Sequence, residues 1–303
     1  MVIDRLIKLR NNKRIFKQCM FDYGSFFVDG TYKVNKIYTH LISLNNNYSA
    51  KTFEKDVFRK KTVFINNSNG SFSEMLICNH GQSIKLFDYD NFIVLTFFKN
   101  HHSFLAQNSS FNSFFPAPAV LYEDNSCLKE ELLIDNNDHK FDRILEFYLS
   151  FYSKVSFTKK SIMPAIIYRE HDCYIDLPSK EMPFCIQHGD CWNANVFNTP
   201  SGLKFIDFDS IGERFFMYDI MLYVFNEAFI LRNDTILFEL INGKFDSTIT
   251  SIIEAIDPSI LGISTKQLFL LAIQQMISER FEKKNNKNMP MVIFNFLMEK
   301  GVY

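Results

Sequence analysis

The feature of this sequence that most constrains its fold is a polar run enclosed by two mainly apolar segments, at residues 184–186 and 203–206. His188, Asp190 and Asn195 lie in the polar run, and the flanking segments have the composition of short strands. Two strands joined by such a loop form a rigid platform that brings polar side chains to one point. The pattern therefore predicts a functional site on this loop.

The residue types of the loop suit the transfer of a phosphoryl group. In that reaction the protein contributes positioning and charge neutralisation rather than covalent chemistry. Asp190 is a carboxylate that can take the proton of an acceptor hydroxyl. Mg²⁺ prefers hard oxygen ligands, which Asn195 and Asp207 offer from opposite arms of the loop. Asp209, expected in the same extended segment as Asp207, would point the same way and complete the metal site.

The order of these residues resembles the signature of a known superfamily. His188-x-Asp190-x4-Asn195, followed by Ile206-Asp207-Phe208-Asp209, is similar to the motifs of the aminoglycoside phosphotransferases, choline kinases and fructosamine kinases. Trp192 adds to the similarity with fructosamine kinases. Further along, Tyr218-Asp219-Ile220 resembles the aromatic, acidic and aliphatic element of the following helix. The motifs cover about residues 60–230.

This resemblance implies roles for the matching residues. Asp190 would be the catalytic base, with Asn195 as a second catalytic residue. Asn195, Asp207 and Asp209 would hold Mg²⁺. His188, Trp192 and Asp219 would support the loop.

A zinc site is an alternative interpretation of part of the same loop. Cys185-x2-His188-x2-Cys191 has the spacing of metal ligands. A structural zinc site needs four ligands, and the nearest further pair, His171 and Cys173, is a weak candidate. The phosphotransferase interpretation is therefore preferred.

The rest of the chain divides into a β-rich half and a helical half. Turn signals separate short β-like segments at 61–66, 74–80, 83–88, 119–123 and 128–134, with a helix-like insertion at about 91–107. Helical periodicity predicts helices at about 141–155, 215–231, 235–242, 247–256, 264–281 and 291–299. Ser264 and Gln267 form a capping box at the start of the fifth of these helices.

These elements predict an α+β protein with the bilobal, protein-kinase-like fold that the resemblance implies. Residues 1–58 are expected to be an N-terminal extension, with a basic helix followed by a segment of mixed pattern. Residues 59–136 would form a nucleotide-binding lobe built on a small antiparallel sheet. Residues 137–303 would form a mainly helical lobe that carries the catalytic loop and binds the acceptor.

The resemblance also implies a nucleotide site in the first lobe. Gly70 and Ser71 are the candidates for a loop over the phosphates, because amides next to a glycine can approach oxygen atoms closely. Lys85 is the candidate for the strand lysine that binds the phosphates, and Lys99 replaces it if 92–98 is the strand instead. Backbone groups near Glu131 and Leu133 would face the adenine. The helix glutamate that normally pairs with the lysine is missing, because no acidic residue occurs between residues 91 and 122.

Charge and composition exclude several other functions. The net charge of −1 gives no general attraction to nucleic acid. No apolar segment resembles a signal peptide or is long enough to span a bilayer, and the six cysteines are expected to be reduced, which indicates a cytoplasmic protein. The basic residues of the first helix could touch a membrane surface, although a solvated helix packed on the protein is the preferred interpretation.

The sequence therefore predicts an ATP- and Mg²⁺-dependent kinase that phosphorylates a hydroxyl of a small molecule, such as an amino alcohol, a sugar or a glycan precursor. A protein kinase-like effector is an alternative, but the short segment after Asp209 favours a small acceptor. A pseudokinase that binds nucleotide or a partner is a second alternative, suggested by the missing glutamate. The presence of Asp190, Asn195 and Asp207 favours catalysis.

Overall fold

The computed structural model describes residues 32–41, 50–52, 63–65, 70–78, 83–88, 91–98, 113–123, 127–136, 139–162, 181–282 and 288–302. The chain divides into two compact units. Unit 1 comprises residues 1–136 and 199–205, and unit 2 comprises residues 137–198 and 206–303. Each unit is described by itself below.

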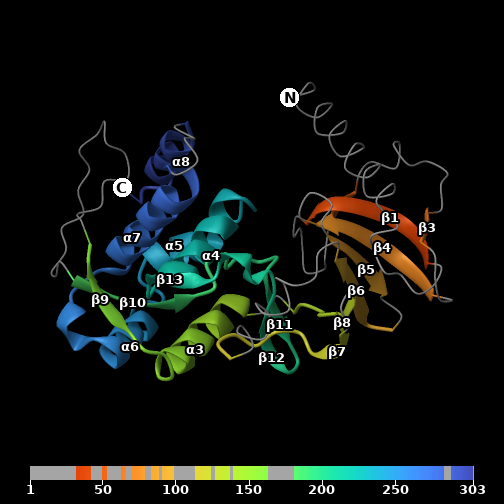
Figure 1. Ribbon diagram of the computed structural model, residues 1–303. Coiled ribbons are helices and arrows are strands. Elements are labelled where there is room, and N and C mark those ends of the chain that lie inside the picture. The colour runs from red at the N-terminus through yellow and green to blue at the C-terminus, as the bar shows by residue number, and fades with distance from the viewer. Residues whose placement is uncertain are drawn as a thin grey trace. The chain divides into compact units, whose positions relative to one another are not determined.

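Unit 1 is built on one large sheet, whose strands carry the red to yellow colours of Figure 1. Its strands are β1 (Tyr32–Leu41), β2 (Ala50–Thr52), β3 (Val63–Ile65), β4 (Gly70–Cys78), β5 (Ser83–Asp88), β6 (Ile93–Phe98), β7 (Val120–Glu123) and β8 (Cys127–Glu131). They lie in the order β2-β1-β4-β5-β6-β8-β7, and β3 pairs with β1. The ladder from β4 to β7 is antiparallel throughout.

Strand β1 lies within residues 1–58, which were expected to be an N-terminal extension, and it adds a parallel pair to the antiparallel sheet predicted after them. It pairs in parallel with β4, with Tyr32 opposite Gly70 and Tyr38 opposite Leu76. The segment is rich in Tyr, Val, Ile and Thr, which favour strands. Local periodicity could not reveal this pairing, because the partner strand is separated from β1 along the chain. The predicted basic helix lies outside the described residues.

Strand β6 (Ile93–Phe98) corrects the prediction of a helix-like insertion at 91–107. It pairs with β5 on one side and with β8 on the other. A six-residue run of β-branched and aromatic side chains is too short for a typical helix and fits a central strand. Residues 99–112 lie outside the described residues.

One face of the central strands is buried. Phe87 of β5 lies opposite Val94 of β6, and Thr96 of β6 lies opposite Leu128 of β8. All four side chains are at most 5 % exposed. Because alternate residues of a strand point to opposite faces, these positions define the packed face of the sheet.

A short segment from much later in the chain also belongs to unit 1. The backbone N–H of Phe205, in β12 (Gly202–Phe205), donates to the carbonyl of Pro116 at 2.7 Å. The rings of Phe205 and Phe115 are 5.3 Å apart and fully buried. Lys204 contributes a hydrogen bond to the carbonyl of Ala117 at 3.1 Å.

Unit 2 is mainly helical. Its α-helices are α3 (Lys140–Tyr152), α4 (Tyr218–Phe229), α5 (Thr235–Ile241), α6 (Asp246–Ile256), α7 (Thr265–Ile277) and α8 (Asn288–Glu299). A three-stranded sheet has the order β13-β10-β9, formed by Gly212–Phe215, Glu181–Gln187 and Thr158–Ser161. The strands β11 (Val196–Thr199) and β12 form a hairpin, and the division of the sequence between the two units falls within β11, after Asn198. The predicted α+β class is confirmed in the described residues.

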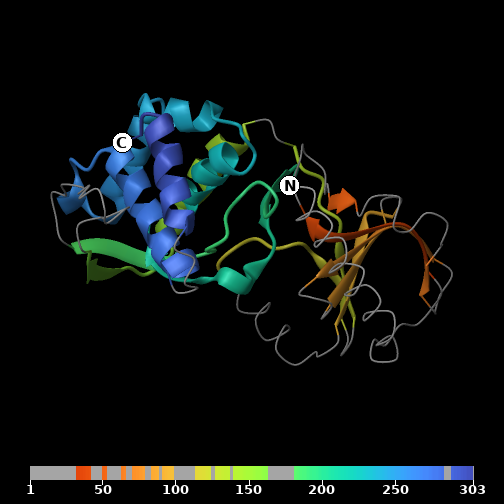
Figure 2. The same ribbon diagram turned by 90° about the horizontal axis from the view of Figure 1, so that it is seen from above.

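Helix α4 is the central element of unit 2. Eleven of its twelve residues are buried, so it has no solvated face. It lies against α5 and α7, as Figures 1 and 2 show. Phe225 and Phe229 of α4 also contact Phe296 of α8, with ring centroids 6.1 and 5.1 Å apart.

The expected capping box is present at the start of α7. The side chain of Ser264 accepts from the backbone N–H of Gln267, and the side chain of Gln267 accepts from the backbone N–H of Ser264. The beginning of this helix is therefore encoded locally. None of the helices described is both long and apolar enough to cross a membrane.

Candidate active site

The candidate site lies on the loop that joins β10 to β11. The loop closes with a tight turn, in which the backbone N–H groups of Asn195 and Val196 both donate to the carbonyl of Trp192. The turn places Asn195 directly before β11, so its position is set by the strand as well as by the turn. This gives Trp192 a structural part in the loop through its backbone.

Asp219, in the first turn of α4, anchors the beginning of the loop. Its carboxylate is fully buried and accepts from the backbone N–H groups of His188 at 2.6 Å and Gly189 at 2.8 Å. The hydroxyl of Tyr148 in α3 donates to the same carboxylate at 2.6 Å. Two backbone donors that would otherwise be buried without partners are thereby satisfied.

Gly189 is required by both its backbone conformation and its surroundings. Its φ is +82°, in the left-handed region that side chains disfavour. A Cβ atom at this position would lie 2.2 Å from the carbonyl oxygen of Ser210 and 2.5 Å from Nη1 of Arg214. The loop can therefore pass this close to Ser210 and Arg214 only with glycine.

His188 joins the two arms of the site. Its ring is fully buried, and Nε2 lies 3.0 Å from the carbonyl oxygen of Ile206. Burial lowers the pKa of His188, so the ring is neutral. The backbone N–H of Asp190 donates to Nδ1 at 3.3 Å, which leaves Nε2 as the protonated nitrogen that donates to Ile206.

Asp207 is brought to the loop by the same segment. The backbone N–H of Ile206 donates to the carbonyl of Asn195 at 3.0 Å, so the residue before Asp207 is bonded to the candidate metal ligand. Asp207 itself adopts a left-handed conformation with φ 64° and is exposed. The oxygen ligands expected on opposite arms therefore come from segments that hydrogen bond to each other.

Asp209 departs from the expected geometry. It lies in a 3-10 helix, η4 (Phe208–Ser210), and not in an extended segment. Strand β12 ends at Phe205 and Asp207 is left-handed, so the alternation of a strand does not apply to Asp207 and Asp209. The side chain of Asp209 lies outside the described residues.

Asn195 and Asp190 are in direct contact. The amide nitrogen of Asn195 donates to the carbonyl of Asp190 at 3.0 Å and to its Oδ2 at 2.9 Å. The amide oxygen accepts no hydrogen bond from the described residues. With its nitrogen held by Asp190, Asn195 therefore presents an oxygen, the atom type that Mg²⁺ prefers. The donor set of Asn195 and Asp207 fits a magnesium ion.

The alternative zinc site is not formed in the described part of the chain. Both ring nitrogens of His188 are engaged by protein atoms. Burial raises the pKa of Cys185 to about 12 and that of Cys191 well above its ordinary value, which disfavours the thiolates that bind zinc. Among the described residues, no group of three His, Cys, Asp or Glu side chains could hold a metal ion.

Lys140 is a residue near the loop that the sequence analysis missed. It is the first residue of α3 and is 3 % exposed. Its Nζ donates to the backbone carbonyl of Asn193 at 3.2 Å and to the Asn193 side chain. A signal existed, because Lys140 lies four residues before the buried Ile144 and so on the apolar face of its helix.

Two arginines that the sequence analysis also missed lie beside the loop. Nη2 of Arg280 donates to the carbonyl of Gly189 at 2.6 Å and to Oδ1 of Asp190 at 2.7 Å. Arg214 of β13 pairs with Glu279 at 2.8 Å. No local pattern could identify Arg280, since it is 90 residues from Asp190 in the sequence.

The nucleotide candidates of unit 1 have mixed outcomes. The loop expected at 69–73 is wrong for Gly70 and Ser71, which begin β4 and pair with Tyr32 and Lys33 of β1. Their backbones belong to a sheet ladder and are not arranged to cradle phosphates. Lys85 lies in the middle of β5, opposite Thr96, on the same face of the sheet as the buried Phe87.

The segment after β8 was expected to present backbone groups to adenine. The N–H of Glu131 donates to the carbonyl of Ala119 at 2.9 Å, and the N–H of Leu132 donates to that of Phe92 at 2.8 Å. Within the described residues, the N–H of Leu133 has no hydrogen bond. Of these three amides, Leu133 is therefore the one that remains available to a ligand.

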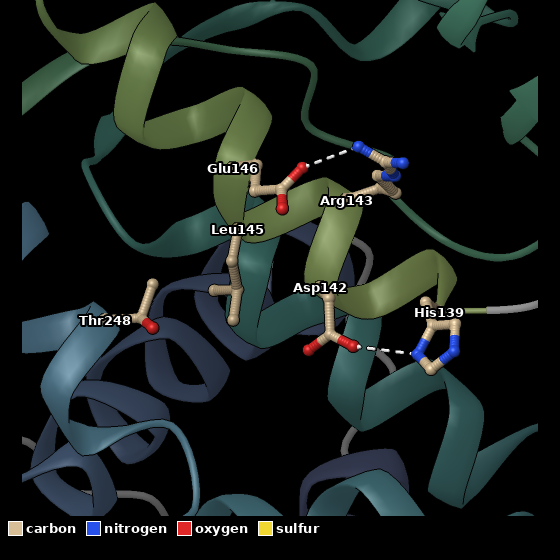
Figure 3. Close-up of a pocket in the computed structure, with 6 residues that line it drawn as sticks. All are labelled: His139, Asp142, Arg143, Leu145, Glu146 and Thr248. Carbon is tan, nitrogen blue, oxygen red and sulfur yellow. Dashed lines mark hydrogen bonds and ion pairs between the residues drawn. The ribbon is translucent and has the colours of Figure 1, made fainter.

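Unit 2 contains two cavities near α3. One, of about 270 Å³, is lined by Lys140 and Asn193 and so adjoins the loop. The other, of about 510 Å³, lies between α3 and Thr248 of α6, and Figure 3 shows it. Its polar lining consists largely of two exposed pairs, His139 with Asp142 and Arg143 with Glu146. The second cavity contains no residue of the candidate site.

The chain was compared with family models, curated proteins and solved structures. No family model matches the sequence, and no curated protein matches it. The solved structures similar to the chain include the choline kinase LicA of Streptococcus pneumoniae, with 12 % identity over 72 % of this chain and 90 % of that chain and a TM-score of 0.36.

Two further similar structures are kinases as well. An ethanolamine kinase of Plasmodium vivax has 13 % identity over 73 % of this chain and 80 % of that chain, with a TM-score of 0.37. The amicoumacin kinase hAmiN, in complex with AMP-PNP, Ca²⁺ and Ami, has 11 % identity over 72 % of this chain and 85 % of that chain, also with a TM-score of 0.37.

Proposed function

We propose that this chain is an ATP- and Mg²⁺-dependent phosphotransferase of the bilobal kinase-like type that phosphorylates a hydroxyl of a small molecule. The observation that carries the proposal is the contact of Asn195 with Asp190 at 2.9 Å. It places a carboxylate beside an amide whose oxygen is left for a metal. The backbone N–H of Ile206, the residue before Asp207, donates to the carbonyl of Asn195, which supports a metal site shared by these two segments. A proton acceptor and two hard metal ligands are the groups that phosphoryl transfer requires.

In this proposal, each described residue has a defined task. Asp190 orients the acceptor hydroxyl and takes its proton as the oxygen bonds to the γ-phosphorus, while the bond from that phosphorus to the β,γ-bridging oxygen breaks and ADP leaves. Asn195 and Asp207 would hold Mg²⁺, which would neutralise charge on the phosphate oxygens. His188 and Asp219 keep the loop in place through the hydrogen bonds described above.

The nucleotide contacts of unit 1 form a second part of the proposal. Lys85 would bind the phosphates, and the backbone of the segment from Glu131 to Leu133 would face the adenine. The N–H of Leu133, which has no hydrogen-bond partner among the described residues, supports this assignment, whereas Gly70 and Ser71 are not included. The acceptor is an amino alcohol, a sugar or a glycan precursor.

The proposal is tested by ADP release in the presence of ATP and Mg²⁺ across a panel of amino alcohols, sugars, nucleosides and aminoglycosides. The wild type should release ADP with at least one acceptor, and Asp190→Ala should lower kcat by about 10³-fold or more, as expected for loss of an essential proton acceptor. Asp142→Asn, an exposed carboxylate on α3, is the matched control and should retain activity. Equal release by wild type and Asp190→Ala with every acceptor would refute the proposal. Binding of MgATP without turnover would instead favour the pseudokinase alternative.

A further inference from the structure

The end of helix α7 reaches the candidate active site. After Ile277 the helix continues as one π-helical segment, η6 (Ser278–Glu282), which contains Arg280. Short π segments within helices are frequent at functional sites, because they redirect side chains away from the regular helical face. Here the redirected side chain is Arg280, which contacts Gly189 and Asp190 through Nη2.

The contact completes the support of the Asp190 carboxylate. Arg280 donates to Oδ1 at 2.7 Å, and Asn195 donates to Oδ2 at 2.9 Å. With one donor on each oxygen, rotation of the carboxylate about its bond to Cβ is restricted from both sides. Each oxygen can still accept a second hydrogen bond, so the group remains able to receive a substrate hydroxyl.

Arg280 is itself held in place by its neighbours. Glu279 pairs with Nε of Arg214 at 2.8 Å and accepts a hydrogen bond from Gln275 at 2.8 Å. The guanidinium of Arg214 lies over the ring of Tyr218, 5.1 Å from its centroid. These contacts connect α7, β13 and the start of α4 around the loop, so the position of Arg280 does not depend on its own bonds alone.

The ion pair of Arg280 and Asp190 is also partly exposed to solvent. The side chains of Arg280 and Asp190 are 31 % and 26 % exposed, so a ligand can reach them. Burial lowers the pKa of Arg280, but Tyr218 and Asp190 raise it more, and the net pKa lies above its ordinary value. A positive charge therefore lies next to Oδ1 of the carboxylate proposed to receive the acceptor proton.

We propose that Arg280 is a positioning residue for phosphoryl transfer, which fixes the Asp190 carboxylate for the acceptor hydroxyl and makes the end of α7 part of the active centre. This inference rests on the proposed function. A simple structural ion pair is the competing explanation, and it predicts a different result. An ion pair with only a structural role would act on folding stability alone, so its loss would leave kcat unchanged.

The test compares Arg280→Met, Arg280→Lys and the control Arg143→Met, which removes an exposed arginine of α3 outside the site. We expect Arg280→Met to lower kcat by about 10²-fold, as small misplacements of reacting groups do, with KM for ATP changed by less than about threefold. Arg280→Lys should have a kcat between those of Arg280→Met and the wild type. An ammonium group keeps the positive charge but lacks the planar set of N–H donors of a guanidinium. Arg143→Met should match the wild type. A kcat of Arg280→Met within about twofold of wild type would overturn the inference.

Two further measurements distinguish a failure of the inference on Arg280 from a failure of the proposed function. Ethylguanidinium added to Arg280→Ala should restore kcat at least about tenfold and should leave Asp190→Ala inactive, since only the former lacks a guanidinium. A wild type that binds no MgATP and releases no ADP refutes the proposed function, and the inference fails with it.

The contact between Arg280 and Asp190 is tested independently of turnover by the thermal unfolding of Arg280→Met, Asp190→Asn and their double variant. Strictly additive shifts in Tm would overturn it.

Discussion

The buried carboxylate of Asp219 gives the most quantitative prediction. It accepts hydrogen bonds from two backbone N–H groups, those of His188 and Gly189, and from the hydroxyl of Tyr148. The first and last of these bonds are made to Oδ2, and the second to Oδ1. Asp219→Asn keeps the shape but replaces one acceptor oxygen with an NH₂ group, so at least one backbone donor faces another donor.

The magnitude follows from the number of bonds lost. A hydrogen bond to a charged group contributes about 1.5–3 kcal/mol, and a buried donor without a partner costs about 1–3 kcal/mol. We therefore expect Asp219→Asn to lower the free energy of unfolding by about 2–3 kcal/mol. Tyr148→Phe removes one bond and leaves both backbone donors satisfied, so it should cost about 1–2 kcal/mol. Asp219→Ala should cost the most, because both N–H groups lose their acceptor.

The assay is urea unfolding of the three variants and the wild type, followed by circular dichroism. Asp142→Asn is the matched control, since its carboxylate is 52 % exposed and it should change the free energy of unfolding by less than about 0.5 kcal/mol. If Asp219→Asn unfolds within about 0.5 kcal/mol of the wild type, Asp219 does not anchor the loop and the reasoning is refuted.

Three other changes probe the same loop. Burial lowers the pKa of His188, so the unfolded chain takes up a proton that the folded chain does not as the pH falls below about 6.5. The wild type should therefore lose up to about 1.4 kcal/mol of stability per pH unit below that point relative to His188→Asn, measured by urea unfolding between about pH 7 and pH 5.5. Gly189→Ala should lower the free energy of unfolding by about 3 kcal/mol, because left-handed backbone and a close contact with Ser210 add together. Lys140→Met should lower it by about 1–3 kcal/mol, because the Asn193 oxygens lose a buried donor.

Each of these predictions has an outcome that contradicts it. Parallel pH profiles for the wild type and His188→Asn would show that the ring is not held neutral by burial. A stable Gly189→Ala protein would mean that the loop does not approach Ser210. An unchanged Tm for Lys140→Met would remove Lys140 from the support of the loop.

Elements that depend on a few neighbouring residues could be predicted from the sequence. The capping box of Ser264 and Gln267 and the strand at Ser83–Asp88 were predicted in place, because the signals lie within a few residues. The α+β class followed from the change of apolar period near residue 140. The roles of Asp190, Asn195 and Asp207 were predicted from chemistry and motif order and stay proposals here.

The parts that sequence reasoning missed depend on contacts between distant segments. The strand β1 forms through pairing with β4, and β6 is stabilised by a neighbour on each side. Arg280 lies in the π segment after α7 and contacts Asp190 across 90 residues of sequence. Asp209 lies in a 3-10 helix and not in the expected extended segment, since β12 ends at Phe205 and Asp207 is left-handed. None of these events leaves a periodic signal in the chain.

The most direct test of the central claim follows the γ-phosphoryl group through a single turnover. Enzyme in excess over labelled MgATP is mixed with an acceptor, quenched at intervals and analysed for labelled product, and nucleotide affinity is measured separately. We predict that Asp190→Asn binds MgATP within about threefold of the wild type and transfers the phosphoryl group at least about 10³-fold more slowly, because Asp190 acts on the acceptor and not on the nucleotide. Transfer at the wild-type rate by Asp190→Asn, or no transfer by the wild type to any acceptor, would contradict the account.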